Sequence, residues 1–164
     1  MKKACLYFLI LLTLTSCVRT YYIVRHAEKA APAASMSSDV PLSEAGEDRA
    51  IILRDQLQSK KIRTIYATNT IRTKRTAGPL SSTIGVPIST YGLRPDSAFI
   101  RLLREGKGNT LVVGHSNTVD DTVNMLTGEK KLQDLNENVY NNLFVVRINR
   151  NGKVVSVQHL TYGN

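Results

Sequence analysis

The sequence has no tryptophan, only two cysteines and far fewer acidic than basic residues. Cys5 and Cys17 both lie near the N-terminus, so the chain from Val18 onward cannot form an internal disulfide bond. No apolar run is as long as a membrane-spanning helix, which requires about 20 residues. The sequence has no long Lys/Arg run and no interleaving of aromatic with basic residues. The usual signs of a nucleic-acid-binding protein are therefore missing.

The composition that remains is typical of one globular domain. Hydrophobic residues make up 42% of the 164 residues and charged residues 21%. The net charge is +9, which favours anionic partners such as phosphorylated substrates or anionic lipid. The basic residues are scattered, so a solvated basic surface accounts for most of this charge.

The N-terminal segment is typical of an exported protein. Lys2 and Lys3 precede a short apolar run, as in a secretory signal peptide. The following Leu14-Thr15-Ser16-Cys17 resembles the lipobox of bacterial lipoproteins. We therefore expect residues 1–16 to be a signal peptide, Cys17 to be the lipid site, and the protein to be lipid-anchored in the cell envelope, facing the periplasm or the outer membrane. Alternatives are an ordinary cleaved signal or an uncleaved anchor.

The apolar patterns of residues 20–164 predict six strands alternating with four helices. The helices are expected to start after Ser43 and Thr70 and around Ser97 and Thr118, and Asn151-Gly152 is typical of a hairpin turn. The predicted strands are 21–24, 62–67, 87–91, 110–113, 143–148 and 154–160. Such alternation indicates right-handed crossovers and an α/β fold, a three-layer α/β/α sandwich with a mostly parallel central sheet.

Three predicted strands end in residues that bear chemistry. Arg25 and His26 follow the first strand, Arg72 follows the second, and His115 follows the strand at 110–113. Ligands gather at the carboxyl ends of strands in such sheets, so we expect these four side chains to converge. Arg donors match phosphate oxygens in pairs, and neutral imidazole is a competent nucleophile. The group therefore suits attack on phosphorus.

Four segments resemble the motifs of the histidine phosphatase superfamily, the phosphoglycerate mutase-like proteins. Residues 25–28, Arg-His-Ala-Glu, resemble its Arg-His-Gly-Glu signature, with Ala in place of the commoner Gly. Residues 42–46 resemble its Leu-Ser/Thr-x-x-Gly helix start, and residues 66–72 the segment of its second pocket arginine, with Thr where Ser is usual. Residues 113–118 resemble its second histidine motif. Together the resemblance covers about residues 21–160.

The resemblance implies a reaction mechanism. His26 would become phosphorylated, Arg25, Arg72 and His115 would hold the phosphoryl group, and water would release phosphate. It implies no cofactor and no metal, and the sequence has no Cys/His/carboxylate cluster with metal-ligand spacing. A phosphatase is expected rather than a mutase, because mutases of this family carry longer insertions.

Three further residues have two interpretations each. Asp96 is the candidate general acid that protonates the leaving oxygen, or it caps a helix. Glu28 either touches substrate or pairs with an arginine. Asn117 either donates to the phosphate or caps the helix after His115.

The expected substrate is a small phosphate monoester, and an envelope phosphosugar would fit the export signal and the basic charge. A phosphohistidine protein phosphatase fits the chain length. The alternative from another class is a non-catalytic lipoprotein that binds phosphorylated ligands, in which His26 would have no role as a nucleophile.

Overall fold

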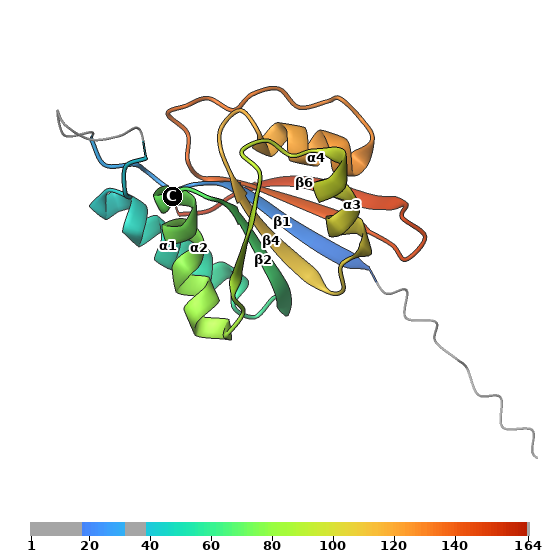
Figure 1. Cartoon of the computed structure of the whole chain (residues 1–164), viewed down its shortest axis with the longest axis horizontal. Helices are drawn as coiled ribbons and strands as arrows, with labels where there is room; N and C mark the ends of the chain where they lie inside the picture. Colours follow the sequence, from blue (N-terminus) through green and yellow to red (C-terminus); the bar gives the residue numbers. More distant parts are fainter. Residues whose placement is uncertain (1–17, 32–38, 164) are drawn as a thin grey trace, which may run out of the picture.

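The computed structural model describes residues 18–31 and 39–163. The expected signal peptide and the lipid site at Cys17 lie outside these residues. The described chain forms six strands and four helices in the predicted order (Figure 1). They are β1 (Arg19–Arg25), α1 (Glu44–Leu57), β2 (Ile62–Thr68), α2 (Ile71–Ile84), β3 (Ile88–Tyr91), α3 (Ser97–Glu105), β4 (Asn109–Gly114), α4 (Val119–Thr127), β5 (Asn142–Ile148) and β6 (Val154–Thr161).

The strands form one sheet in the order β3-β2-β4-β1-β5-β6. The pairs β2–β3, β2–β4 and β1–β4 are parallel, whereas β5 runs antiparallel to both of its neighbours. The expectation of a mostly parallel sheet is therefore confirmed. The predicted hairpin joins β5 to β6. Its Gly152 has a φ of 77°, a backbone conformation that residues other than glycine rarely adopt.

Two hydrophobic cores lie on opposite faces of this sheet. Side chains alternate along β1, so Tyr22 and Val24 pack toward one core and Tyr21 and Ile23 toward the other. The first core contains the apolar side chains of α1 and α2, and the second contains those of α3 and α4. The result is the expected three-layer α/β/α sandwich.

Local sequence signals fix the helix starts. Ser43, Thr70 and Asp96 each accept a hydrogen bond from a backbone N–H in the first turn of the helix that follows. Such caps satisfy donors that the helix cannot satisfy itself. None of the helices within the described ranges has the length and apolar character needed to cross a membrane.

Candidate active site

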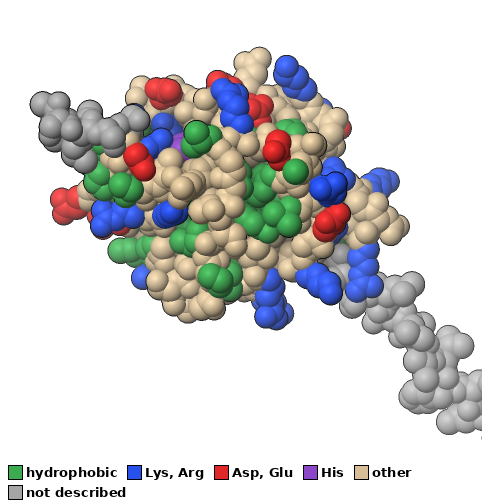
Figure 2. All heavy atoms as spheres, viewed as in Figure 1, with side chains coloured by type: hydrophobic (Ala, Val, Ile, Leu, Met, Phe, Trp, Pro, Cys, Tyr) green, Lys and Arg blue, Asp and Glu red, His purple; other side chains and the backbone are tan. Residues whose placement is uncertain are grey.

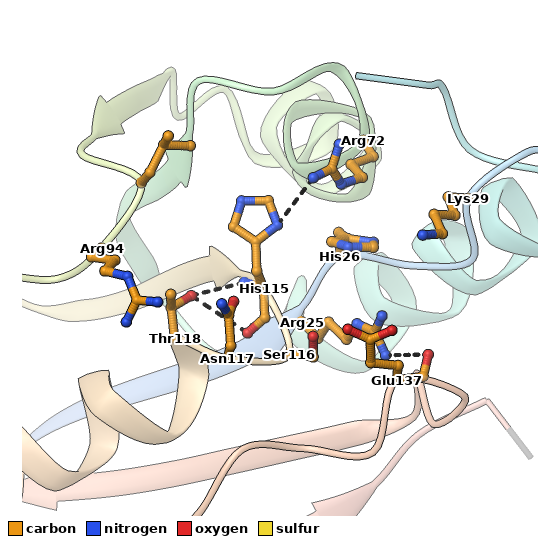
Figure 3. Close-up of a pocket in the computed structure, with 11 residues that line it drawn as sticks. Arg25, His26, Lys29, Arg72, Arg94, His115, Ser116, Asn117, Thr118 and Glu137 are labelled. Carbon is orange, nitrogen blue, oxygen red and sulfur yellow. Dashed lines mark hydrogen bonds between the residues drawn. The ribbon is translucent and has the colours of Figure 1, made fainter. Parts of the chain in front are cut away.

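The site lies where three neighbouring strands of the sheet end. β1, β4 and β2 are adjacent, Arg25 lies opposite Gly114, and Ala67 lies opposite Val113. The segments that follow these strands therefore leave the sheet at the same level. Figure 3 shows side chains from all three segments around one pocket. The expected convergence of Arg25, His26, Arg72 and His115 is what the structure has.

His26 is held in one orientation and one tautomer. Its Nδ1 lies 2.8 Å from the carbonyl oxygen of Ala27, which can only accept, so Nδ1 carries the hydrogen and Nε2 carries the lone pair. The residue is 4% exposed. Burial, and the charges of Arg25 and Arg72, lower its pKa from 6.5 to about 3. Its imidazole is thus neutral at physiological pH and retains a nucleophilic nitrogen.

Arg25 is positioned by the loop between α4 and β5. Its Nη1 donates to the carbonyl oxygens of Asn136, Glu137 and Val139 at 3.2, 2.7 and 3.3 Å. Its guanidinium lies 4.2 Å from the ring centroid of Tyr140, a cation–π distance. Its Nε is buried and donates to no atom of the described residues. A buried donor without an acceptor is costly, and an anion in the pocket would satisfy it.

Arg72 projects from the first turn of α2 and is oriented by an acidic residue. Its Nη1 lies 3.3 Å from a carboxylate oxygen of Asp39, and the same carboxylate accepts from the backbone N–H of Ile71 at 3.0 Å. Asp39 therefore links the guanidinium to the start of the helix. Nη2 of Arg72 lies 3.5 Å from Nδ1 of His115, toward which it points in Figure 3.

His115 is anchored from below by a buried hydroxyl. Its Nε2 lies 2.8 Å from Oγ1 of Thr68, which is fully buried. Because a guanidinium can only donate, Nδ1 accepts from Arg72, and Nε2 therefore carries the hydrogen and donates to Thr68. Burial and the charges of Arg72 and Arg25 lower the pKa of His115 to about 4. Its ring centroid lies 5.4 Å from that of His26.

The pocket has a volume of about 470 Å³ and a strongly positive lining. Four cations and one carboxylate face it, together with two neutral imidazoles and a few neutral side chains. An anion is the ligand that this balance favours. The lining residues are Arg25, His26, Lys29, Arg72, Leu93, Arg94, His115, Ser116, Asn117, Thr118 and Glu137. Within residues 18–31 and 39–163, no group of three His, Cys, Asp or Glu side chains could hold a metal ion.

The loop after His26 is fixed by α1 and α2. The N–H of Ala27 donates to Oγ1 of Thr76 at 2.9 Å, and the N–H of Ser43 donates to the carbonyl of Glu28 at 2.9 Å. A Cβ added at Gly46 would lie 2.2 Å from that same carbonyl oxygen, so only glycine allows α1 to approach so closely. This contact explains the glycine of the Leu-Ser-x-x-Gly segment.

Two of the three residues with two interpretations lie away from the pocket lining. Glu28 forms an ion pair with Arg49, with oxygen–nitrogen distances from 2.7 to 2.9 Å, so the structure favours the pairing interpretation over contact with substrate. Asp96 caps α3 by accepting from the N–H of Phe99 at 2.7 Å and does not line the pocket, so the geometry favours a cap over a general acid. Asn117 does line the pocket and does not cap α4, whose N-cap residue is Thr118.

Sequence reasoning missed Glu137 as a site residue. It lies in the irregular segment between α4 and β5, which has neither helical nor strand periodicity and no motif that could have indicated it. Its carboxylate is the only one in the lining of the pocket as described, and Figure 3 shows it near Arg25 and Ser116. Arg94 and Asp39 also lie in loops beyond the motifs.

Comparisons with known proteins agree with this arrangement. The family model of the histidine phosphatase superfamily (branch 1) matches residues 21–94, which include Arg25, His26 and Arg72. The protein histidine phosphatase SixA, solved with tungstate, is similar with a TM-score of 0.67 and 21% identity, over 87% of this chain and 96% of that one. A search of curated protein sequences gave no match.

Two further solved structures have the same fold. A phosphoglycerate mutase from Plasmodium falciparum is similar with a TM-score of 0.57 and 21% identity, over 87% of this chain and 90% of that one. A mycobacterial glucosyl-3-phosphoglycerate phosphatase has a TM-score of 0.62 and 13% identity, over 88% and 98% of the two chains.

The fold is thus the α/β sandwich of phosphoglycerate mutase-like proteins, with arginine and histidine side chains at the carboxyl ends of its central strands. The resemblance to the histidine phosphatase superfamily that the motifs indicated is confirmed, in sequence over residues 21–94 and in fold over the domain.

Proposed function

We propose that the domain is a metal-independent phosphatase that hydrolyses a phosphate monoester through a phosphohistidine intermediate on His26. The observation that carries the proposal is the hydrogen bond from Nδ1 of His26 to the carbonyl of Ala27. This bond leaves the lone pair on Nε2 of a buried, neutral imidazole in a pocket lined by four cations. Binding alone would not need a nucleophile in that state.

The contacts support a role for each side chain in the first step. Nε2 of His26 attacks phosphorus while the bond from phosphorus to the leaving oxygen breaks. The ring then gains positive charge, which the carbonyl of Ala27 stabilises through the Nδ1 hydrogen. Arg25 and Arg72 bind the charged phosphoryl oxygens, and a bound dianion favours protonation of His115 at Nδ1, so that it donates to a third.

We assign proton transfer to Glu137. As a carboxylic acid it gives a proton to the leaving oxygen; as a carboxylate it then takes one from the water that attacks the phosphohistidine, and the phosphorus–nitrogen bond breaks. Its place in the pocket lining supports this assignment, whereas Asp96 is occupied with the N–H of Phe99. The intermediate returns to the free enzyme with inorganic phosphate as product.

The first test is phosphate release from p-nitrophenyl phosphate by residues 18–164 with EDTA present. This part contains every helix and strand described and both hydrophobic cores, and the matched SixA chain is covered almost completely by it. We expect turnover that disappears in His26→Ala, while binding of a phosphate analogue such as tungstate persists. Turnover that survives in His26→Ala would exclude a phosphohistidine on His26.

The role of Glu137 is tested with leaving groups of different basicity. Glu137→Gln should slow hydrolysis of an alkyl phosphate on the order of 100-fold, since its leaving oxygen needs a proton, and slow p-nitrophenyl phosphate much less. Asp96→Asn is the matched control, because asparagine also caps helices. If Asp96→Asn shows the selective loss instead, Asp96 is the acid and the assignment of Glu137 is wrong.

The substrate class is part of the proposal. Lys29 and Arg94 at the pocket favour a monoester with a second anionic or polar group, such as an envelope phosphosugar. Phosphohistidine in a protein is the alternative substrate, favoured by the fold similarity to SixA. Parallel assays on a sugar phosphate and on a phosphohistidine peptide decide between them. Binding of phosphorylated ligands with no turnover of either would instead support the non-catalytic lipoprotein.

A further inference from the structure

A second concentration of positive charge lies at the edge of the sheet opposite the pocket. The parallel strands β1, β2 and β4 begin there, and the turn between β5 and β6 lies beside the start of β1, because Ile148 pairs with both Arg19 and Val154. Figure 2 shows Lys and Arg side chains around this end of the molecule. We call five of them the basic edge: Arg19, Arg63, Arg104, Lys107 and Arg150.

The basic edge surrounds a shallow cavity of about 580 Å³. Four of its members line this cavity, and Glu105 is the one acidic residue in the lining as described. The fifth, Arg63, extends across Gly108 in the cavity wall, since a Cβ added there would lie 2.5 Å from its Cγ. Lys107 and Arg150 are exposed. The cavity therefore presents cations to solvent with little compensating charge.

Backbone carbonyls, not carboxylates, hold the two inner arginines. Nη1 of Arg19 donates to the carbonyl of Gly106 at 2.9 Å and to that of Arg104. Nη2 of Arg104 donates to the carbonyl of Leu126 at 2.6 Å. None of the ion pairs formed among the described residues involves the basic edge. These guanidinium groups are therefore fixed in place while their charge remains available to an anion.

The start of β1 indicates which surface lies against the basic edge. Val18, the first residue described, directly precedes Arg19, and the expected lipid site Cys17 comes just before it. We propose that the basic edge lies on the anionic lipid of the membrane into which Cys17 is anchored. An acyl anchor is strengthened by nearby cations, each worth about a fivefold gain in binding at an anionic surface. This contact does not depend on the proposed catalytic function.

The contact would also orient the pocket. β1 joins the basic edge at Arg19 to the site at Arg25 over six residue steps, a span of about 20 Å. The pocket therefore opens at the opposite edge, away from the lipid beneath the domain. In this orientation the site meets phosphorylated groups that approach from the aqueous side, not the headgroups of its own leaflet.

Vesicle sedimentation tests the lipid contact on residues 18–164, which carry no acyl chain. We expect binding to phosphatidylcholine vesicles that contain about 30% phosphatidylglycerol, weak binding to pure phosphatidylcholine, and loss of binding in high salt. Lys107→Glu/Arg150→Glu should weaken binding to anionic vesicles at least about tenfold. Both side chains are exposed, so the fold should persist, and the melting temperature checks it.

The matched control changes the same net charge near the pocket. Lys74 and Arg75 are exposed side chains in the first half of α2, close to where β2 ends. Lys74→Glu/Arg75→Glu should retain nearly wild-type binding. Equal weakening by both double variants would mean that only net charge matters, and it would overturn the proposal. So would equal binding to neutral and anionic vesicles.

The absence of cysteine after Cys17 allows a direct test of orientation. A fluorophore is attached to Asn151→Cys, in the turn beside the basic edge, or to Lys74→Cys near the pocket. With an acceptor lipid in anionic vesicles, energy transfer should be clearly stronger from position 151. Equal transfer from the two positions, or stronger transfer from position 74, would contradict the orientation.

Discussion

The low pKa of His26 predicts a loss of stability in mild acid. The folded protein holds this imidazole neutral with a pKa of about 3, whereas in the unfolded chain it titrates near 6.5. Below pH 6.5 the imidazole is therefore protonated in the unfolded state but stays neutral in the folded state. The contribution of this group to the free energy of unfolding is fully present well above pH 6.5 and is lost as the pH falls toward 3. The cause is burial first, and then the neighbouring arginines.

The magnitude follows from the two pKa values. At pH 5.0 the unfolded imidazole is almost fully protonated and the folded one almost fully neutral, which costs about 2 kcal/mol of unfolding free energy relative to pH 7.5. Urea unfolding of wild type and His26→Ala at the two pH values measures it. The variant has its own baseline, so the quantity of interest is the difference between the two pH-induced changes. We expect wild type to lose about 2 kcal/mol more than the variant.

His159→Gln is the control for loss of a histidine elsewhere, because this residue is exposed on β6 and remote from the pocket. Equal pH-induced losses in wild type and His26→Ala would refute the buried neutral imidazole. Unfolding is measured without phosphate or its analogues, because a ligand that binds only the folded state would raise the apparent stability.

Three further substitutions, two of them with a matched control, probe the supports of the site. Gly46→Ala places a Cβ against a backbone carbonyl and should lower the free energy of unfolding by about 1–3 kcal/mol, whereas Gly78→Ala in open space on α2 should raise it slightly; urea unfolding measures both. Thr68→Val removes the acceptor of the second histidine and should lower kcat more than it raises KM, in steady-state kinetics. Tyr140→Leu should weaken tungstate binding severalfold by freeing Arg25, and Tyr140→Phe should retain it in calorimetry.

The sequence predicted most of the fold because its local signals agree with one another. Ser43 and Thr70 are found as caps, and the strand patterns at 110–113 and 143–148 lie inside β4 and β5. Strand order could not be read from such signals. It depends on which faces of the helices pack together, and that information is spread over the whole chain.

The site was predictable only where a regular element carries it. His26 and His115 follow strands whose apolar patterns are clear, so the sheet itself brings them together. Glu137 and Arg94 lie in irregular segments, where side-chain direction is decided by tertiary contacts. Asp96 has the side-chain chemistry of a general acid and stands at the start of a predicted helix, where it could also be a cap. Only the three-dimensional structure shows that its carboxylate accepts from the N–H of Phe99.

The irregular segment between α4 and β5 ties positioning to proton transfer. Its carbonyls hold Arg25 through Nη1, its Tyr140 packs on the same guanidinium, and its Glu137 faces the pocket. A displacement of this segment would therefore move Arg25, which the proposal assigns to phosphate binding, and the proposed acid together. Since the ring centroid of Tyr140 lies 6.0 Å from that of His26, the proposed nucleophile would lose a neighbour as well. In this domain β1 places His26, the proposed nucleophile, and the segment between α4 and β5 orients Arg25 and brings Glu137 to the pocket.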